Sequence, residues 1–427
     1  MLKRVPTDKI VLGMFIHKLE GTWFQHPFWK SRFLITDPGM LETLTNSDVP
    51  SVMIDTSRGL DFSDQPSAPT PRPVARVFGT GRGFNPARTM PPAASRQPII
   101  RSAPQSSTIA EFGKARQITQ RAGKVVTRVF LKARLGKAFE AQEVEPVIDE
   151  IYASVQRNLY AFNGLLRCQQ DRHFIYRHAL AVSALMISLA RQMKLSPIDI
   201  REAGMAGLMM DIGIGQLPDK SIGNFDDLRQ LPRKMLDQHV LLGYALLKAS
   251  GGVPKRVIDV SLQHHERLDG SGYPNGISGE EITLFSRMAA ICDEYDDLVS
   301  CDGDRVGCDP GAAIRILAET GGGLDPAVMS HFIEMLGIYP IGAFVALRSG
   351  RIAMVVDEDP QDHALPTVRT FYSNDSGKRI KGETIALAHC YGADEIVGLA
   401  ELAGLELPDL GDLRKSILAA YARGSGG

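Results

Sequence analysis

The chain has 427 residues, of which 44% are hydrophobic and 23% are charged, a composition that predicts a soluble globular protein of two or three domains. Its five cysteines lack CxxC spacing, which argues against a disulfide framework and against a thiolate zinc site. The net charge of −1 conceals a basic stretch from Arg72 to Lys137. We interpret this stretch as a solvated linker and helix face, so nucleic acid is not expected as a partner.

The longest apolar run extends from Ala179 to Ala190, which is too short to span a bilayer. The N-terminus has no charged-then-apolar leader with a small-residue cleavage site, as a secreted precursor would have. We therefore expect a cytoplasmic protein without a membrane partner. The sequence leaves the oligomeric state open, including a homo-oligomer.

The first part of the chain is expected to form a small strand-rich domain, residues 1–60. Apolar and polar positions alternate there in short runs that glycine and proline interrupt. Both tryptophans, Trp23 and Trp29, lie in this part, and we interpret them as core rather than as a binding face. Residues 61–107 are rich in proline, serine and arginine. Such a segment buries too little apolar surface to fold, so we expect a flexible linker.

Helical periodicity begins after this linker. From Val144 to Leu159, for example, apolar residues recur at spacings of three and four, as on one face of a helix. We therefore expect residues 108–336 to form an all-helical domain.

The last part of the chain, residues 337–427, is expected to be a C-terminal appendix. Two apolar runs, Phe344–Leu347 and Ile352–Val356, flank the turn residues Arg348-Ser349-Gly350, which predicts a hairpin. Some helix follows. The expected fold class is thus mainly α, with a helical bundle between a strand-rich N-terminal domain and a short β-containing appendix.

The segment from His264 to Pro274, HHERLDGSGYP, is the most informative of the chain. Two adjacent imidazoles and two carboxylates open a glycine-rich turn that closes on a tyrosine and a proline. Neutral imidazole nitrogens bind buried metals, and glycines let a backbone approach a phosphate closely. The segment therefore predicts a metal–phosphate site. The alternative is a polar loop with a satisfied histidine pair.

Further polar side chains lie on or beside apolar helical stripes. Taken singly, each is more often a satisfied core residue than a ligand. Together they supply four imidazoles and two carboxylates, a mixture that suits first-row divalent metals. A carboxylate such as Asp211 can bridge two ions that clamp a phosphoryl group. The predicted metal ligands are His178, Asp211, His239, His264, His265 and Asp293.

The order of these residues resembles the HD-GYP family, bacterial phosphodiesterases of cyclic di-GMP built on the helical HD-domain fold. The loop match is nearly complete, and residues 1–60 look like the small domain that often precedes the catalytic domain. The resemblance implies hydrolysis of cyclic di-GMP to pGpG or GMP, with two, sometimes three, divalent ions activating the water, iron or manganese among the candidates. For this chain we expect one or two ions. It implies catalytic roles for Asp211 and Asp293 and substrate contacts from Asp269, Gly270, Gly272, Tyr273 and Pro274.

The chain departs from the family pattern at catalytic positions. Met210 stands where the family has the histidine of its HD pair, and Ile214 stands where a lysine is expected. A thioether is a soft donor that suits neither Fe(II) nor Mn(II). Phe174 also lacks the carboxylate of three-metal members. In the family pattern the second metal keeps all its ligands, whereas the first, at the positions of His178, Met210, Asp211 and Asp293, lacks one.

Two functions of different class are compatible with this sequence. The first is a slow metal phosphodiesterase, in which a water replaces the missing ligand. The second is a catalytically degenerate module that binds cyclic di-GMP, or a signalling partner such as a diguanylate cyclase domain, through the preserved Gly272-Tyr273-Pro274 loop. A third option is another phosphohydrolase substrate such as a nucleotide, because one scaffold hosts several chemistries.

Overall fold

The structure is a computed structural model that divides the chain into two compact units, Met1–Ser102 and Ala103–Gly427. The expected linker, residues 61–107, and both tryptophans lie outside the described residues. No helix in the described part of the chain combines the length and the apolar character needed to cross a membrane. The structure describes residues 2–20, 33–35, 41, 44, 45, 51–60, 108–158, 162, 174–217, 231–300, 307–319, 323–359, 362, 364–390 and 394–424.

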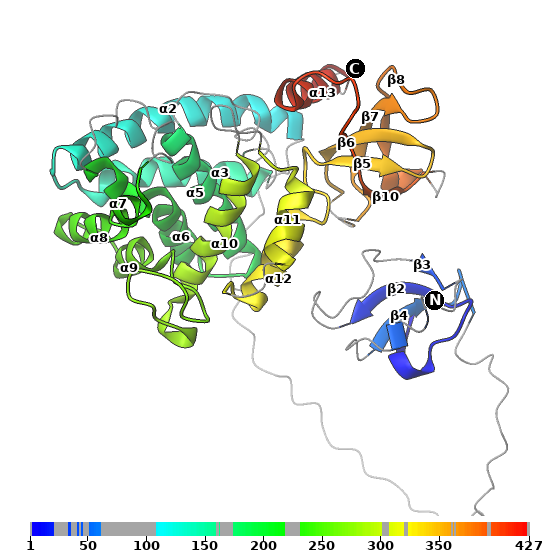
Figure 1. The fold of residues 1–427 in the computed structure, drawn as a ribbon, viewed down its shortest axis with the longest axis horizontal. Coiled ribbons are helices and arrows are strands. Elements are labelled where there is room, and N and C mark those ends of the chain that lie inside the picture. Colours follow the sequence, from blue (N-terminus) through cyan, green and yellow to red (C-terminus); the bar gives the residue numbers. More distant parts are fainter. Residues whose placement is uncertain are drawn as a thin grey trace, which may run out of the picture. The chain divides into compact units, whose positions relative to one another are not determined.

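The first unit contains a four-stranded antiparallel sheet with strand order β1-β4-β2-β3 (Figure 1). Strand β1 (Leu2–Pro6) leads through the 3-10 turn η1 (Thr7–Lys9) toward β2 (Phe15–Glu20). Strand β3 (Phe33–Leu34) pairs with β2, and β4 (Ser51–Asp55) lies between β1 and β2. The small strand-rich N-terminal part is therefore confirmed. Its core contains Val5, Ile10, Met14, Ile16, Ile35, Leu44, Val52 and Ile54.

The second unit begins with helices, as the periodicity predicts. Figure 1 shows the long helix α2 lying along one side of the other helices. Short 3-10 turns η4 (Ala141–Glu143), η5 (Ile212–Gln216) and η7 (Gly279–Glu281) interrupt the series. The α-helices are α2 (Thr108–Arg134), α3 (Glu145–Arg157), α5 (Phe174–Gln192), α6 (Pro197–Met209), α7 (Arg233–Leu236), α8 (His239–Ala249), α9 (Lys255–Gln263), α10 (Leu284–Val299), α11 (Pro310–Glu319) and α12 (Pro326–Leu336).

Local sequence signals fix where several of these helices begin and end. Ser196 caps α6, since its side chain accepts a hydrogen bond from the backbone of Asp199, and a proline follows at the first helical position. Asp325 caps α12 in the same way. This helix ends at Gly337, whose φ of 77° favours glycine.

Helix α5 is the central helix of the bundle. It packs against α2, α3, α6, α10 and α12, and nearly all of its side chains from Ile175 to Ala190 are buried. A helix that is buried on every side is hydrophobic all round. The apolar run from Ala179 to Ala190 therefore belongs to a core helix.

The C-terminal part contains a six-stranded sheet, with order β10-β5-β6-β7-β8 and with β9 on β7. The predicted hairpin is present, because β5 and β6 pair across a turn at Gly350, where φ is 73°. The sheet is larger than this hairpin. Its strands and its helix are β5 (Phe344–Leu347), β6 (Arg351–Asp357), β7 (Thr367–Ser373), β8 (Lys378–Arg379), β9 (Thr384–Ala386), β10 (Ile396–Leu399) and α13 (Leu410–Gly424), with the turn η8 (Leu387–His389).

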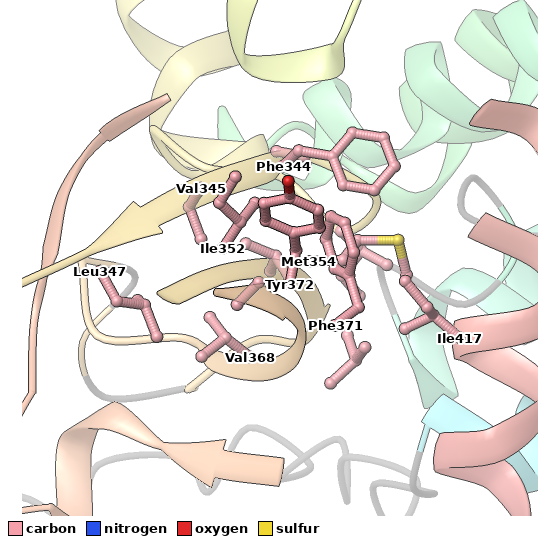
Figure 2. Packing of buried hydrophobic residues seen from close by; sticks show 14 of the residues in the cluster. Phe344, Val345, Leu347, Ile352, Met354, Val368, Phe371, Tyr372 and Ile417 are labelled. Atoms are coloured by element: carbon pink, nitrogen blue, oxygen red, sulfur yellow. The ribbon is translucent and has the colours of Figure 1, made fainter. Parts of the chain in front are cut away.

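This sheet has a hydrophobic core of its own. Figure 2 shows Phe344, Phe371 and Tyr372 from the strands and Ile417 from α13 grouped together. The rings of Phe344 and Phe371 meet edge to face, with centroids 5.5 Å apart, a favourable geometry for aromatic pairs. The mainly helical fold with strand-containing ends is therefore confirmed.

A partly buried ion pair connects the helices to this sheet. Asp309, directly before α11, accepts hydrogen bonds from the backbone of Gly311 and of Phe344, both at 2.9 Å. Arg414 of α13 lies 3.5 Å from the same carboxylate and donates to the Gly342 carbonyl oxygen at 3.0 Å. These contacts join α11, β5 and α13.

Candidate metal centre

The structure brings the six predicted ligands together between helices of the bundle. His178 lies in α5, and Asp293 lies in α10. Asp211 directly precedes η5, and His239 is the first residue of α8. The remaining two, His264 and His265, follow the end of α9. His178, Asp211, His239 and His264 are buried, and His265 and Asp293 are half-buried.

The donor atoms form two groups, and Asp211 faces both. One group is His239, His264 and His265, and the other is His178, Asp211 and Asp293; within each, the donor atoms lie within 4.8 Å of one another. Oδ2 of Asp211 lies 3.3 Å from His178 Nε2. Oδ1 lies 3.2 Å from His239 Nε2 and 3.5 Å from His264 Nε2. This is the arrangement of a carboxylate that bridges two ions.

Backbone carbonyl groups fix the tautomers of two histidines. His239 donates from Nδ1 to the Leu236 carbonyl oxygen at 2.7 Å, and His264 donates from Nδ1 to that of Val260 at 3.0 Å. In the neutral rings the Nε2 atom of each histidine then carries a lone pair. These two nitrogen atoms lie only 3.3 Å apart. Two lone pairs at this distance repel each other unless a proton or a cation lies between them. The donor set therefore fits a metal ion, since neutral imidazole is a common metal ligand.

His178 is oriented by a carboxylate that the sequence reasoning missed, that of Asp296. His178 donates from Nδ1 to Asp296 Oδ2 at 2.8 Å, and Ser300 donates to the same oxygen at 3.2 Å. The other ring nitrogen, Nε2, lies 3.0 Å from Asp293 Oδ1. A carboxylate on the far side of a ligating histidine fixes its tautomer and raises its basicity. Asp296 lies three residues after Asp293 on the same helix, a spacing that could have indicated it.

The electrostatics of the group follow from its burial and its charges. Burial lowers the pKa of His178, but the carboxylates of Asp211, Asp293 and Asp296 outweigh burial and raise it well above its usual value. Burial would raise the pKa of Asp211, yet its close contacts with His178, His239 and His264 hold it well below its usual value. Burial and the neighbouring histidines lower the pKa of His265. A metal ion held at His178 Nε2 would have to displace any proton on that nitrogen.

Two glycines allow the elements that carry Asp211 and His239 to meet. A Cβ atom on Gly213 would overlap the carbonyl oxygen of His239 and the backbone of Gly243. A Cβ atom on Gly243 would lie 2.6 Å from Ser261 Oγ. The absence of side chains at both positions lets η5 pack directly on the first turns of α8.

A cavity of about 520 Å³ opens beside the donors. Five of the six predicted ligands line it, together with Ile214 and Tyr273. The Tyr273 ring stacks on the ring of His265, with centroids 4.7 Å apart and planes inclined by 20°. Met210 is fully buried and is not among the described residues that line the cavity. Ile214 therefore brings an apolar side chain to the cavity, and the Met210 thioether is not exposed in it.

The remaining residues of the loop shape its backbone. Asp269 is exposed, and its carboxylate accepts hydrogen bonds from Ser271 N at 3.0 Å and Ser271 Oγ at 2.6 Å. Gly270 has a φ of 78°, which favours glycine. A Cβ atom on Gly272 would overlap the backbone of Glu266 and Arg267. Of the five predicted substrate residues, only Tyr273 is among the described residues that line the cavity, so for Asp269, Gly270, Gly272 and Pro274 substrate contact stays a prediction.

Three charged residues of the cavity wall were not singled out from the sequence. Arg267 forms a close ion pair with Glu294, and both line the cavity. The guanidinium of Arg233, from α7, lies 5.4 Å from the centre of the Tyr273 ring and lines the cavity as well. Sequence reasoning could not place Arg233, because α7 is a four-residue helix preceded by a segment without clear periodicity.

Comparison with known proteins assigns the family. A model described as a domain of unknown function (DUF3391) matches residues 2–144, and a model described as an HD domain matches residues 165–328. The cyclic di-GMP phosphodiesterase PA4108 of Pseudomonas aeruginosa is 37% identical over 401 residues, which are 93% of this chain and 92% of that protein. The chain belongs to the HD-GYP family. Its HD domain, of a metal-dependent family, contains all six donors.

Other HD-GYP relatives are similar over shorter parts. The cyclic di-GMP phosphodiesterase response regulator RpfG of Xanthomonas campestris is 35% identical over 34% of this chain and 39% of its own length. The solved structure titled as Bd1817, an HDG"Y"P protein of Bdellovibrio bacteriovorus, covers 79% of this chain and 99% of its own, at 13% identity and a TM-score of 0.44. The HD-GYP assignment rests on the relative that spans both units, not on this structural likeness.

Proposed function

We propose that the protein is an HD-GYP-type metal-dependent phosphodiesterase that hydrolyses cyclic di-GMP to pGpG or GMP in bacterial second-messenger signalling, at a reduced rate. The observation that supports this most is the position of Asp211, whose two oxygens face two separate donor groups beside a cavity. A ligand phosphate in that cavity would lie next to both groups. The relatives named as cyclic di-GMP phosphodiesterases favour the same substrate.

The residues divide into two ligand groups in this proposal. Asp211, His239, His264 and His265 would hold one ion, and His178, Asp211 and Asp293 would hold the other. Bound divalent ions such as iron or manganese polarise a phosphoryl oxygen and make water a better nucleophile at neutral pH. The chain contributes orientation: Asp296 positions His178, and Tyr273 stacks on His265 and limits the space for the dinucleotide.

The reduced rate follows from two positions. Met210 offers no suitable donor where the family pattern has histidine, which leaves the His178 group with three side-chain ligands. Ile214 brings no charge where a lysine is expected. Losing a donor to a developing oxyanion costs about a hundredfold to a thousandfold in rate. Even outer-shell changes around a metal cost about tenfold to a hundredfold.

The same two positions favour a second candidate, a module that binds cyclic di-GMP without cleaving it. The preserved loop that ends at Tyr273 and Pro274 could also contact a protein partner such as a diguanylate cyclase domain. In this case the cavity and the intact histidine group serve recognition, and the His178 group holds no ion.

Hydrolysis and binding measured on one preparation separate the two candidates. Protein loaded with Mn(II) or Fe(II) is incubated with cyclic di-GMP, the products are separated by chromatography, and affinity is measured by calorimetry. Formation of pGpG or GMP that Asp211→Asn abolishes supports the phosphodiesterase. Tight binding without products supports the binding module and contradicts the phosphodiesterase. Neither binding nor products would contradict both.

A further inference from the structure

Among the described residues, two arginines line the cavity, and one of them is fully engaged by the protein. Arg267 pairs closely with Glu294 through Nη2, which balances its charge. Through Nη1 it donates to the carbonyl oxygens of His264 at 3.3 Å and Glu266 at 3.1 Å. Arg267 therefore braces the start of the loop and has little capacity left for a ligand.

Arg233 is engaged at one nitrogen only. Its Nε lies 2.8 Å from Asp237 Oδ1, one turn further along the chain, and its guanidinium lies over the Tyr273 ring. Within the part of the chain that the structure describes, Nη1 and Nη2 have no hydrogen-bond or ion-pair partner. The side chain is 72% exposed. A cation with two free donor groups thus lies at the open side of the cavity.

The rest of the cavity wall is less favourable for an anion than the surroundings of Arg233. On the α10 side, Asp293 is a predicted metal ligand and Glu294 is paired with Arg267, which leaves the carboxylate of Asp297. Ile214 and Leu236 are apolar. Away from the metal ligands, an anionic group is repelled by the acidic side and gains nothing from the apolar side. The open end near Arg233 is the favourable place for negative charge.

We propose that Arg233 binds a phosphate oxygen of the dinucleotide at the mouth of the cavity and so positions the ligand above Tyr273. This inference rests on the proposed function, because it takes the ligand to be cyclic di-GMP. A planar guanidinium matches the geometry of phosphate oxygens and binds them through two parallel donors. With Nε beside the Asp237 carboxylate, Nη1 and Nη2 stay available for that contact.

The kinetic signature of this role is specific. A contact made equally in the ground state and in the transition state lowers KM without changing kcat. Loss of Arg233 should therefore raise Kd and KM and leave kcat nearly unchanged. Because the side chain is exposed, salt screens the contact, so the affinity of the wild type should fall with added salt more steeply than that of the variant.

The test compares Arg233→Ala, Arg233→Lys and the control Lys234→Ala. Lys234 is the next residue on α7, is exposed and is not among the described residues that line the cavity, and its loss changes the charge equally. Calorimetry of metal-loaded protein with cyclic di-GMP should give a Kd about tenfold higher for Arg233→Ala, the change expected for one charged hydrogen bond. Arg233→Lys should lie between this variant and the wild type, and Lys234→Ala should match the wild type.

Several outcomes overturn the proposal. An Arg233→Ala Kd equal to that of Lys234→Ala contradicts it, and so does a loss in kcat alone. If Arg233 only supported Tyr273, lysine would not restore affinity and the salt dependence of Kd would not change. Wild-type protein that fails to bind cyclic di-GMP overturns the proposed function together with this inference, whereas wild-type binding unaffected by Arg233→Ala overturns this inference alone.

Discussion

Met210 is the residue at which this chain departs most clearly from a complete two-metal site. It directly follows α6, its side chain is fully buried, and its carbonyl oxygen accepts a hydrogen bond from Ser261 Oγ at 3.0 Å. The backbone at this position is therefore well fixed, directly before Asp211. A metal-binding side chain at position 210 would therefore be attached to a well-fixed backbone, as a metal site requires.

Restoring the two missing groups should increase turnover. Met210→His adds an imidazole to the His178 group, and Ile214→Lys adds a cation to the cavity wall. We expect the double variant to hydrolyse cyclic di-GMP at least about tenfold faster than the wild type, the lower end of what ligand-sphere changes cost. Steady-state kinetics with manganese measures this.

The control for this repair is Met210→Leu, which keeps the apolar volume and adds no donor. It should leave metal content and rate at the wild-type level. A double variant no faster than Met210→Leu would contradict the view that these two positions limit turnover.

Asp296 shows how a residue without direct metal contact can support the site. Asp296→Asn removes the negative charge that faces His178 Nδ1 at 2.8 Å. We expect metal affinity to fall by about tenfold to a hundredfold, as for other outer-shell changes, and competition with a chelator measures it. The matched control is Asp259→Asn. Asp259 pairs with Lys255 on α9, and its substitution should not change the metal affinity. Equal affinities for both variants would refute the role of Asp296.

At the scale of residues, the sequence indicated the metal donors better than the residues that orient a donor or line the cavity. All six predicted ligands converge, because imidazoles and carboxylates beside apolar stripes are conspicuous in a sequence. Asp296 and Arg233 were missed, since an acidic residue at the end of a helix and a cation on a short one are ordinary surface features. Their roles depend on neighbours that are distant in the sequence.

At the scale of elements, the contact between η5 and α8 sets the distance from Asp211 to His239. Gly213→Ala would push these two elements apart, because the new methyl group would overlap the His239 carbonyl oxygen. We expect a loss of about 1–3 kcal/mol of unfolding free energy, together with weaker metal binding. Denaturant unfolding and metal titration measure the two effects.

Gly113→Ala is the control for this substitution. Gly113 lies in α2, and a Cβ atom there would have no neighbour within 4 Å. Alanine at such a helical position should stabilise the protein by up to about 1 kcal/mol. If Gly213→Ala were as stable as Gly113→Ala, the close packing of η5 on α8 would not be needed.

The C-terminal sheet shows where element prediction from sequence was incomplete. The β5–β6 hairpin was recognisable because two apolar runs flank a turn. Strands β8 and β9 are two and three residues long and exposed or half-buried, so they leave no apolar pattern. They are fixed by pairing with β7, a tertiary contact that local sequence does not encode.

At the scale of the molecule, the second unit depends on the contact between its helices and its sheet. Arg414→Met removes the partner of the partly buried Asp309 carboxylate. Breaking a fully buried ion pair costs about 3–5 kcal/mol of unfolding free energy. Because the Asp309 side chain is 22% exposed, we expect a smaller loss of unfolding free energy, about 2 kcal/mol. Calorimetric unfolding measures it. Lys415→Met changes the half-buried neighbour of Arg414, whose partner Asp412 is exposed, and should change little. Equal losses in the two variants would contradict the account.

The central claim is that the six donors hold metal through Asp211, and elemental analysis of the purified protein tests it most directly. After loading with Mn(II) and removal of free ions, the wild type should retain between one and two ions per chain. Asp211→Ala should retain none, because Asp211 contacts both donor groups. Wild-type protein without bound metal, or an Asp211→Ala variant with the same content as the wild type, would contradict the account.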